Sequence, residues 1–224
     1  MGDFLNRVDM KKKAISTNKS NINLSKKGES HSINLKKDNN ELSFNLNWES
    51  GNTPSDNGSK SLFDKIKNKL SATSSELDLD LGCMYRLKNG NKGVIQALGD
   101  SFGSLNISPY ILLDGDDRTG ENNDGETLKF SKIEELDVAV IFAFIYEGAV
   151  NWKEAKGIAT IKQPNHSDII INLNDDSSKG MVGIAILVND NNSLKIEKLE
   201  KYYYGHSDLD EDFGFGFNWT SGSK

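Results

Sequence analysis

Short apolar runs follow one another through the last two thirds of the chain, each bounded by Gly, Asn or Asp turn residues. Nine such runs lie in about 145 residues after Ser75, at 77–85, 93–98, 110–113, 138–146, 157–162, 168–173, 180–188, 193–205 and 213–219. The lack of crossover helices between them argues against a doubly wound α/β fold. The spacing predicts an all-β fold, a β-sandwich of two mostly antiparallel sheets with one or two short helices.

The two most apolar runs, Val138–Tyr146 and Met181–Val188, are predicted to be central strands that are covered on both faces. Nearer the N-terminus, His31–Leu35 and Glu41–Trp48 alternate with a period near two, and polar residues at 38–40 supply a turn between them. We expect these two runs to form an antiparallel hairpin. The segment 151–156, NWKEAK, is expected to form a single helical turn.

Charge and composition divide the chain into a tail and a body. Residues 1–27 hold seven Lys and Arg against two Asp and Glu and lack sustained periodicity, which predicts a basic flexible tail. Residues 28–224 are assigned to one sandwich domain. Within it, 49–75 reads as a long loop insertion, and a capping box at Ser61 predicts a short amphipathic helix over 61–70 that packs on the sandwich edge.

The body is acidic, with 14 basic and 25 acidic side chains in residues 71–224. Such a surface does not neutralise phosphate, so cations and not nucleic acid are the expected partners. The single cysteine, Cys83, excludes an intramolecular disulfide framework and a Cys-rich zinc site, and it favours a reducing, cytoplasmic location. The longest apolar run has nine residues against the ~20 that a membrane helix needs, and no secretory signal is expected.

The strongest functional signal is the segment 114–126, DGDDRTGENNDGE, with six carboxylates, two carboxamides and three glycines in 13 residues. Like charges this close repel unless a cation lies among them, and Ca²⁺ prefers such flexible, oxygen-rich loops, with Mg²⁺ as the second choice. An EF-hand does not fit, because Thr119 and Gly125 occupy positions 6 and 12 of that template. The predicted metal ligands in this segment are Asp114, Asp116, Asp117, Asn123, Asp124 and Glu126.

A second acidic pair, Asp78 and Asp80, is expected to complete this site. Alternation in the strand at 76–82 buries Leu77, Leu79 and Leu81 and places the two aspartates on the other face, about 6.6 Å apart. Two carboxylates on one face are costly unless a positive charge lies between them. The alternative is that both acidic segments are a solvated turn and an exposed strand face.

Other candidate sites are weaker. The segment 99–103, GDSFG, matches a nucleophile elbow around Ser101, with His166 or His206 as partners, but Pro109 follows where that motif needs a helix. The histidines are expected at the surface or in turns. Cys83 is expected to be a small buried hydrophobe. Asp208, Asp210 and Asp212 are expected to form a solvated turn, with a secondary cation site as the alternative.

Several motifs resemble the TerD-type tellurium-resistance and stress-response domains, most of all their TerA-type branch. The resemblance covers about residues 28–224 and is carried by LDLD at 77–80, PYILLDGDDRTGENNDGETL at 109–128, VAVIFAFIYEG at 138–148 and YYYGHSDLDEDFGFGFNWTSGSK at 202–224. GDDRTGE at 115–121 is the most specific of these. The chain departs from the family at Gly125, where many members have a second acid, and at Asp117, where an Asn is common.

The resemblance implies a β-sandwich that binds calcium through acidic loops and acts in resistance to tellurite, phage and other stresses. It assigns Asp78 and Asp80 to the family's first acidic strand, Asp116 and Asp117 to its GDN-like step, and Asp124 and Glu126 to the close of the loop. The departures leave one or two ions as alternatives.

Taken together, these observations predict a non-enzymatic, calcium-binding module that acts with other proteins of a stress-response complex. Two alternatives belong to other classes: a metal-assisted hydrolase that uses the same carboxylates, and a scaffold at the inner membrane surface that uses the basic tail or the amphipathic helix.

Overall fold

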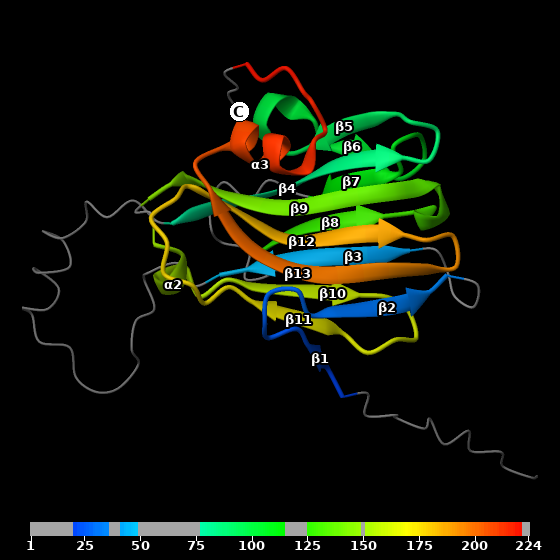
Figure 1. The fold of residues 1–224 in the computed structure, drawn as a ribbon, viewed down its shortest axis with the longest axis horizontal. Coiled ribbons are helices and arrows are strands. Elements are labelled where there is room, and N and C mark those ends of the chain that lie inside the picture. Colours follow the sequence, from blue (N-terminus) through cyan, green and yellow to red (C-terminus); the bar gives the residue numbers. More distant parts are fainter. Residues whose placement is uncertain (1–19, 36–40, 49–76, 115–124, 149–150, 221–224) are drawn as a thin grey trace, which may run out of the picture.

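The computed structural model describes residues 20–35, 41–48, 77–114, 125–148 and 151–220, which form two packed β-sheets (Figure 1). The seven-stranded sheet has the order β1-β11-β10-β3-β8-β7-β6, and the six-stranded sheet has the order β2-β13-β12-β9-β4-β5. Every strand pair is antiparallel except β1 with β11. The predicted mostly β fold with two sheets is confirmed.

The strands of the seven-stranded sheet, in spatial order, are β1 (Ile22–Asn23), β11 (Ile169–Asn172), β10 (Ile158–Lys162), β3 (Leu42–Asn47), β8 (Glu126–Phe130), β7 (Ile111–Asp114) and β6 (Gly103–Ser104). Those of the six-stranded sheet are β2 (Ser30–Asn34), β13 (Ser193–Tyr203), β12 (Met181–Asn189), β9 (Leu136–Glu147), β4 (Asp78–Leu87) and β5 (Lys92–Ile95). The helices within the described residues are α2 (Trp152–Ala155), α3 (His206–Phe213) and the 3-10 turns η1 (Leu98–Asp100) and η2 (Ile133–Glu135). Among these described helices, none is long and apolar enough to cross a bilayer.

Strands β9 and β12 occupy the middle of the six-stranded sheet, as their apolar runs predicted. On one face of β9, Ile141 and Ala143 pack into the core between the sheets. On its other face, Phe142 and Phe144 join a second apolar cluster that includes Leu209 of α3. Coverage on both faces explains why these strands are almost continuously apolar.

The second cluster is covered by a C-terminal cap, which we define as α3 with the segment 214–219. The strand that the sequence predicts over 213–219 is wrong, since α3 ends at Phe213 and 214–219 is irregular. The predicted solvated turn is a helix, in which Asp208 and Asp212 are exposed as expected and Asp210 is buried. Asp210 is only 4% exposed, and its carboxylate accepts hydrogen bonds from the backbone N–H groups of Gly216 and Phe217 and from the indole N–H of Trp219. One buried carboxylate therefore holds the aromatic segment against the helix.

The predicted hairpin of His31–Leu35 and Glu41–Trp48 is also wrong. Strand β2 pairs with β13 in the six-stranded sheet, whereas β3 lies between β8 and β10 in the other sheet (Figure 1). Alternation identifies both segments as strands because each buries one face, but it carries no information about which strand lies beside which.

The boundary at residue 27 between tail and domain is placed too late. Ile22 and Asn23 pair in parallel with Ile169 and Ile170, and Leu24 is buried in the core between the sheets. The fold therefore includes residues from about 20 onward. The ranges that lie outside the described part of the chain include residues 1–19, the insertion at 49–75 with its predicted helix at 61–70, and residues 221–224.

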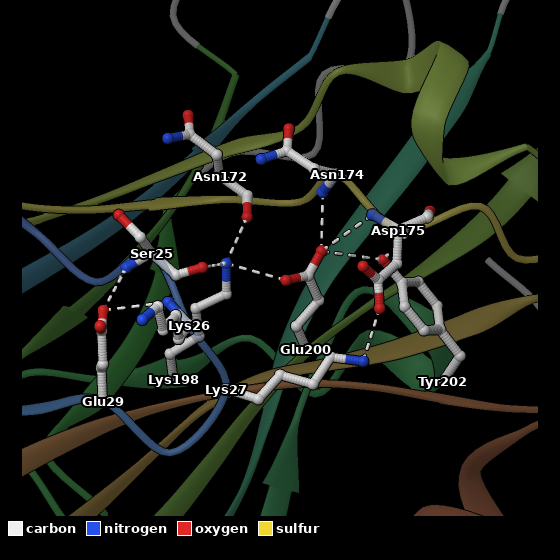
Figure 2. Close-up of polar contacts among 10 residues, drawn as sticks. All are labelled: Ser25, Lys26, Lys27, Glu29, Asn172, Asn174, Asp175, Lys198, Glu200 and Tyr202. Carbon is white, nitrogen blue, oxygen red and sulfur yellow. Dashed lines mark hydrogen bonds and ion pairs between the residues drawn. The ribbon is translucent and has the colours of Figure 1, made fainter.

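A buried ion pair fixes this N-terminal segment to the sandwich. The ammonium of Lys198 lies 2.8 Å from the Glu200 carboxylate, with side chains 1% and 4% exposed, and it donates to the carbonyl oxygens of Ser25 and Asn172 (Figure 2). Its three acceptors come from β13, β11 and the segment after β1. The pair therefore joins three separate parts of the chain at one point.

The acid of the same pair orders the segment that follows β11. Glu200 Oε1 accepts hydrogen bonds from the backbone N–H groups of Asn174 and Asp175, and Lys27 forms an ion pair of 2.5 Å with Asp175 (Figure 2). A buried charge pair is worth retaining only when its remaining hydrogen-bonding groups are satisfied, as they are here by backbone groups.

The predictions for the shorter elements were right for one helix and missed two strands. The predicted helical turn at 151–156 is confirmed as α2, with the Asn151 side chain as an N-cap that accepts from the Glu154 N–H. Strands β6 and β8 were not predicted. In β8, ETLKF, only Leu128 and Phe130 are apolar, because Thr127 and Lys129 lie on the outer face and the interior-facing Glu126 is itself polar.

Candidate functional site

The acidic segment joins two neighbouring strands. Strand β7 ends at Asp114 and β8 begins at Glu126, and Asp114 pairs with Thr127 in the antiparallel register. The structure thereby fixes both ends of the segment at one edge of the seven-stranded sheet. Four predicted ligands, Asp116, Asp117, Asn123 and Asp124, lie outside the described residues.

Gly125 has a structural reason to replace the family's second acid. Its φ of +65° is in the left-handed region that favours glycine, and a Cβ at this position would overlap the carbonyl oxygen of Leu46. The acidic segment therefore returns to β8 close against the backbone of β3. A side chain at position 125 would clash with the Leu46 carbonyl group and force the backbone at 125 away from β3.

Glu126 connects the two sheets. Its side chain is on the same face of β8 as Leu128, which lies in the core between the sheets, and the residue is only 2% exposed. Its Oε2 accepts a hydrogen bond of 2.5 Å from the backbone N–H of Leu81 in β4. The carboxylate that closes the acidic segment therefore contacts the strand that carries Asp78 and Asp80.

The acidic strand differs from the expected one in its environment. Leu79 and Leu81 are buried in the core between the sheets, as alternation predicted. Asp80, however, is fully buried, so the idea of an exposed strand face is wrong for it. The face that alternates with the leucines carries Met84 of the second cluster, and Asp80 is paired across the sheet with Phe144. A register shift separates Asp78, which is half-buried, from Leu79.

Asp114 is oriented differently from Glu126. Its half-exposed carboxylate forms an ion pair with Lys129, two residues beyond its register partner on β8. By the alternation of β8, this pair lies on the outer face of the sheet. Within the described ranges, no group of three or more His, Cys, Asp or Glu side chains is placed so that it could hold a metal ion. A metal centre at this edge therefore requires oxygen atoms from 115–124.

His206, expected at the surface or in a turn, is instead enclosed by aromatic rings. Its ring centroid lies 5.3 Å from that of Phe142, 5.1 Å from that of Phe144 and 5.0 Å from that of Trp219. Burial lowers the pKa of His206 from 6.5 to about 4. The sequence carries a weak signal for this site in the aromatic residues that follow at 213–219.

The partly buried ring of His206 predicts how the stability of the fold changes in acid. Its pKa is lower in the folded state, so the unfolded chain binds more protons between pH 6.5 and about 4. Stability should be complete above pH 6.5 and fall with decreasing pH by up to about 1.4 kcal/mol per unit across this window. Urea unfolding of the wild type and of His206→Phe from pH 4 to 7 measures the effect, and two parallel pH curves would contradict it.

The nucleophile elbow around Ser101 has the wrong geometry. The 3-10 turn η1 precedes Ser101, β6 follows it, and the hydroxyl donates to the Val94 carbonyl oxygen. Cys83 is fully buried, and burial raises the pKa of its thiol, in agreement with its interpretation as a small core residue.

Comparisons with known proteins give a sequence relative and solved structures of similar fold. Profiles of known protein families give no match. The chain is 36% identical over 208 residues to a protein named "Tellurium resistance protein TerA" from Alcaligenes sp., which covers 92% of this chain and 59% of the relative. The chain thus spans about three fifths of that protein's length.

A crystal structure of a protein of unknown function, SAV2460, shares the fold, with a TM-score of 0.52 and 13% identity over 78% of this chain and 95% of that one. At this identity the likeness concerns the arrangement of the sheets alone. The sequence similarity reaches across nearly all of the chain, so this protein is a homologue of the tellurium resistance protein TerA.

Proposed function

We propose that the protein is a calcium-binding module of the TerD type that acts in tellurium resistance or a related stress response, together with other proteins of a complex. The observation that carries the proposal is the anchoring of the acidic segment 114–126 between adjacent strands, beside β4, in a homologue of TerA. Calcium would order this segment and so create a binding surface.

The donor set fits calcium by its chemistry. Six carboxylates and two carboxamides within 13 residues offer the hard oxygen ligands that Ca²⁺ takes in sets of six to eight. The last of these six, Glu126, is buried at the start of β8, and Asp80 adds one more buried carboxylate from β4, the strand whose Leu81 N–H contacts Glu126. Ionised carboxylates in a low-dielectric interior are stabilised by nearby positive charge, so a divalent cation would reduce the cost of their burial. Mg²⁺ fits less well, since it prefers fewer protein ligands.

A binding role is favoured over hydrolysis by the positions of the best candidates for acid–base or nucleophilic chemistry. Cys83 lies in the core, and the His206 ring is enclosed by Phe142, Phe144 and Trp219. Cys83 belongs to β4 and His206 to α3, so neither lies on the two strands that the acidic segment joins. A metal-assisted hydrolase that uses the same acidic segment is the alternative, and it would show turnover of phosphate or acyl esters that depends on calcium or magnesium.

Calcium should stabilise the folded protein. Binding to the native state alone adds about 2.7 kcal/mol at a hundredfold excess of ligand over Kd. The melting temperature in millimolar calcium should therefore exceed that in excess chelator by several degrees. Equal melting temperatures under the two conditions would contradict the proposal.

Substitutions can show whether the acidic segment is responsible. The double variant Asp116→Asn with Asp124→Asn should weaken calcium binding about tenfold or more, because ligand charge tunes affinity in oxygen sites. Asp176→Asn is the matched control, since this exposed acid lies in the segment after β11. If both variants lost the same affinity, general surface charge and not a site would hold the ion.

A further inference from the structure

A cavity of about 660 Å³ lies at the end of β8 opposite Glu126. Strand β3 lies between β8 and β10 at this point (Figure 1), and all three strands contribute to its walls. The volume is in the range of small-molecule sites. The lining residues are Glu41, Leu42, Ser43, Leu105, Asn106, Lys129, Phe130, Ser131, Lys162, Gln163, Pro164 and Asp168.

One wall contains a buried carboxamide with unused hydrogen-bonding capacity. Gln163 is 6% exposed, and neither its side-chain nitrogen nor its oxygen forms a hydrogen bond within the described part of the chain. Leaving such a group unsatisfied costs about 1–3 kcal/mol per group. A glutamine that serves only packing would be replaced at a gain in stability by an apolar residue of similar size. Retention at a cost is typical of residues that serve binding.

Charges of both signs line the same cavity. Lys162 on β10 is exposed and pairs in register with Ser43 on β3, which in turn pairs with Lys129 on β8. Lys129 is engaged by Asp114, whereas Lys162 forms no ion pair with any described residue. Two acids, Glu41 and Asp168, supply the negative charge of the lining, and neither forms an ion pair with a described residue.

We propose that this cavity binds a small zwitterion of the amino-acid or short-peptide type. Lys162 takes its carboxylate, Glu41 and Asp168 take its ammonium group, and the Gln163 carboxamide turns toward the cavity to bond its amide or carboxylate. The apolar remainder of the lining, from Leu105, Phe130 and Pro164, accommodates a side chain. The groups that take the zwitterion, Lys162, Gln163, Glu41 and Asp168, are not among the predicted calcium ligands, so binding at this site does not require calcium.

The test uses the full chain with triglycine and each of the twenty amino acids as probes, at millimolar concentration, with and without calcium. The side-chain NH₂ resonances of Gln163, assigned by their loss in Gln163→Met, should shift with at least one probe. Calorimetry should then show binding weakened at least tenfold by Lys162→Met and by Gln163→Met. Lys153→Met, at an exposed position of α2, is the control and should bind as the wild type.

Stability separates a binding role of Gln163 from a structural one. Gln163→Met should raise the melting temperature of the free protein while it weakens binding. A lower melting temperature would assign Gln163 to the fold, and the absence of any Gln163 shift with all probes would overturn the proposal. Failure of calcium binding would leave these outcomes unchanged, so the two proposals fail separately.

Discussion

Replacing Lys198 by Met should lower the free energy of unfolding by about 3–5 kcal/mol, the range for breaking a buried ion pair from one side. The substitution removes the charge that faces Glu200 and leaves that carboxylate in the interior, with a side chain only 4% exposed. It also removes the donor to the Ser25 and Asn172 carbonyl oxygens. Urea unfolding followed by circular dichroism measures the loss.

A second substitution isolates the charge from the packing. In the double variant Lys198→Met with Glu200→Gln, the amide oxygen still accepts from the backbone N–H groups of Asn174 and Asp175, while no uncompensated charge is left. About half of the lost stability should return, with a coupling energy within the ~0.5–3 kcal/mol that contacting residues show. Additive effects of the two single substitutions would contradict this explanation.

The same strand offers a matched control. Lys195 and Glu197 form an ion pair of 2.6 Å on β13, with side chains 47% and 30% exposed. Exposed ion pairs contribute about 0–1 kcal/mol, so Lys195→Met should change the free energy of unfolding by less than about 1 kcal/mol. A loss at Lys195 as large as that at Lys198 would show that burial is not what makes the Lys198–Glu200 pair important.

Replacing Asp210 by Ala should be almost as damaging, with an expected loss of about 3–5 kcal/mol, since three donors lose a charged acceptor worth roughly 1.5–3 kcal/mol each before relaxation. Those donors are the N–H groups of Gly216 and Phe217 and the indole N–H of Trp219. The C-terminal cap should separate from the six-stranded sheet. A red shift of tryptophan fluorescence and binding of a hydrophobic dye would report the exposed cluster.

Asp208 on the same helix provides the comparison for Asp210. It is exposed and accepts one hydrogen bond, from the Tyr204 N–H. Asp208→Ala should therefore cost less than about 1 kcal/mol and leave the fluorescence spectrum unchanged. An equal loss from both substitutions would mean that helix charge, and not the three hydrogen bonds, holds the cap.

The sequence predicted those parts of the fold that follow from local pattern. Val138–Tyr146 and Met181–Val188 are continuously apolar because both of their faces are covered, which identified them as central strands. The capping side chain of Asn151 is adjacent to the helical turn that it begins, so α2 could also be predicted from the sequence. Both signals lie within a few residues of the element that they predict.

What the sequence missed depends on contacts between distant segments. The burial of Asp210 comes from donors that the polar composition of 206–212 does not reveal. The pairing of β2 with β13 joins segments about 160 residues apart, and no local pattern records it. In the candidate site, the sequence indicated the acidic residues, but the contact from Glu126 to Leu81 is a tertiary feature.

The most direct test of the central proposal is a calorimetric titration of the chelator-treated full chain with calcium, followed by the same titration with magnesium. The account predicts saturable binding of one or two calcium ions, weaker binding of magnesium, and loss of the calcium heat in the double variant Asp116→Asn with Asp124→Asn. A chain that is folded by circular dichroism but shows no saturable calcium heat, or that binds calcium equally well without Asp116 and Asp124, would contradict it.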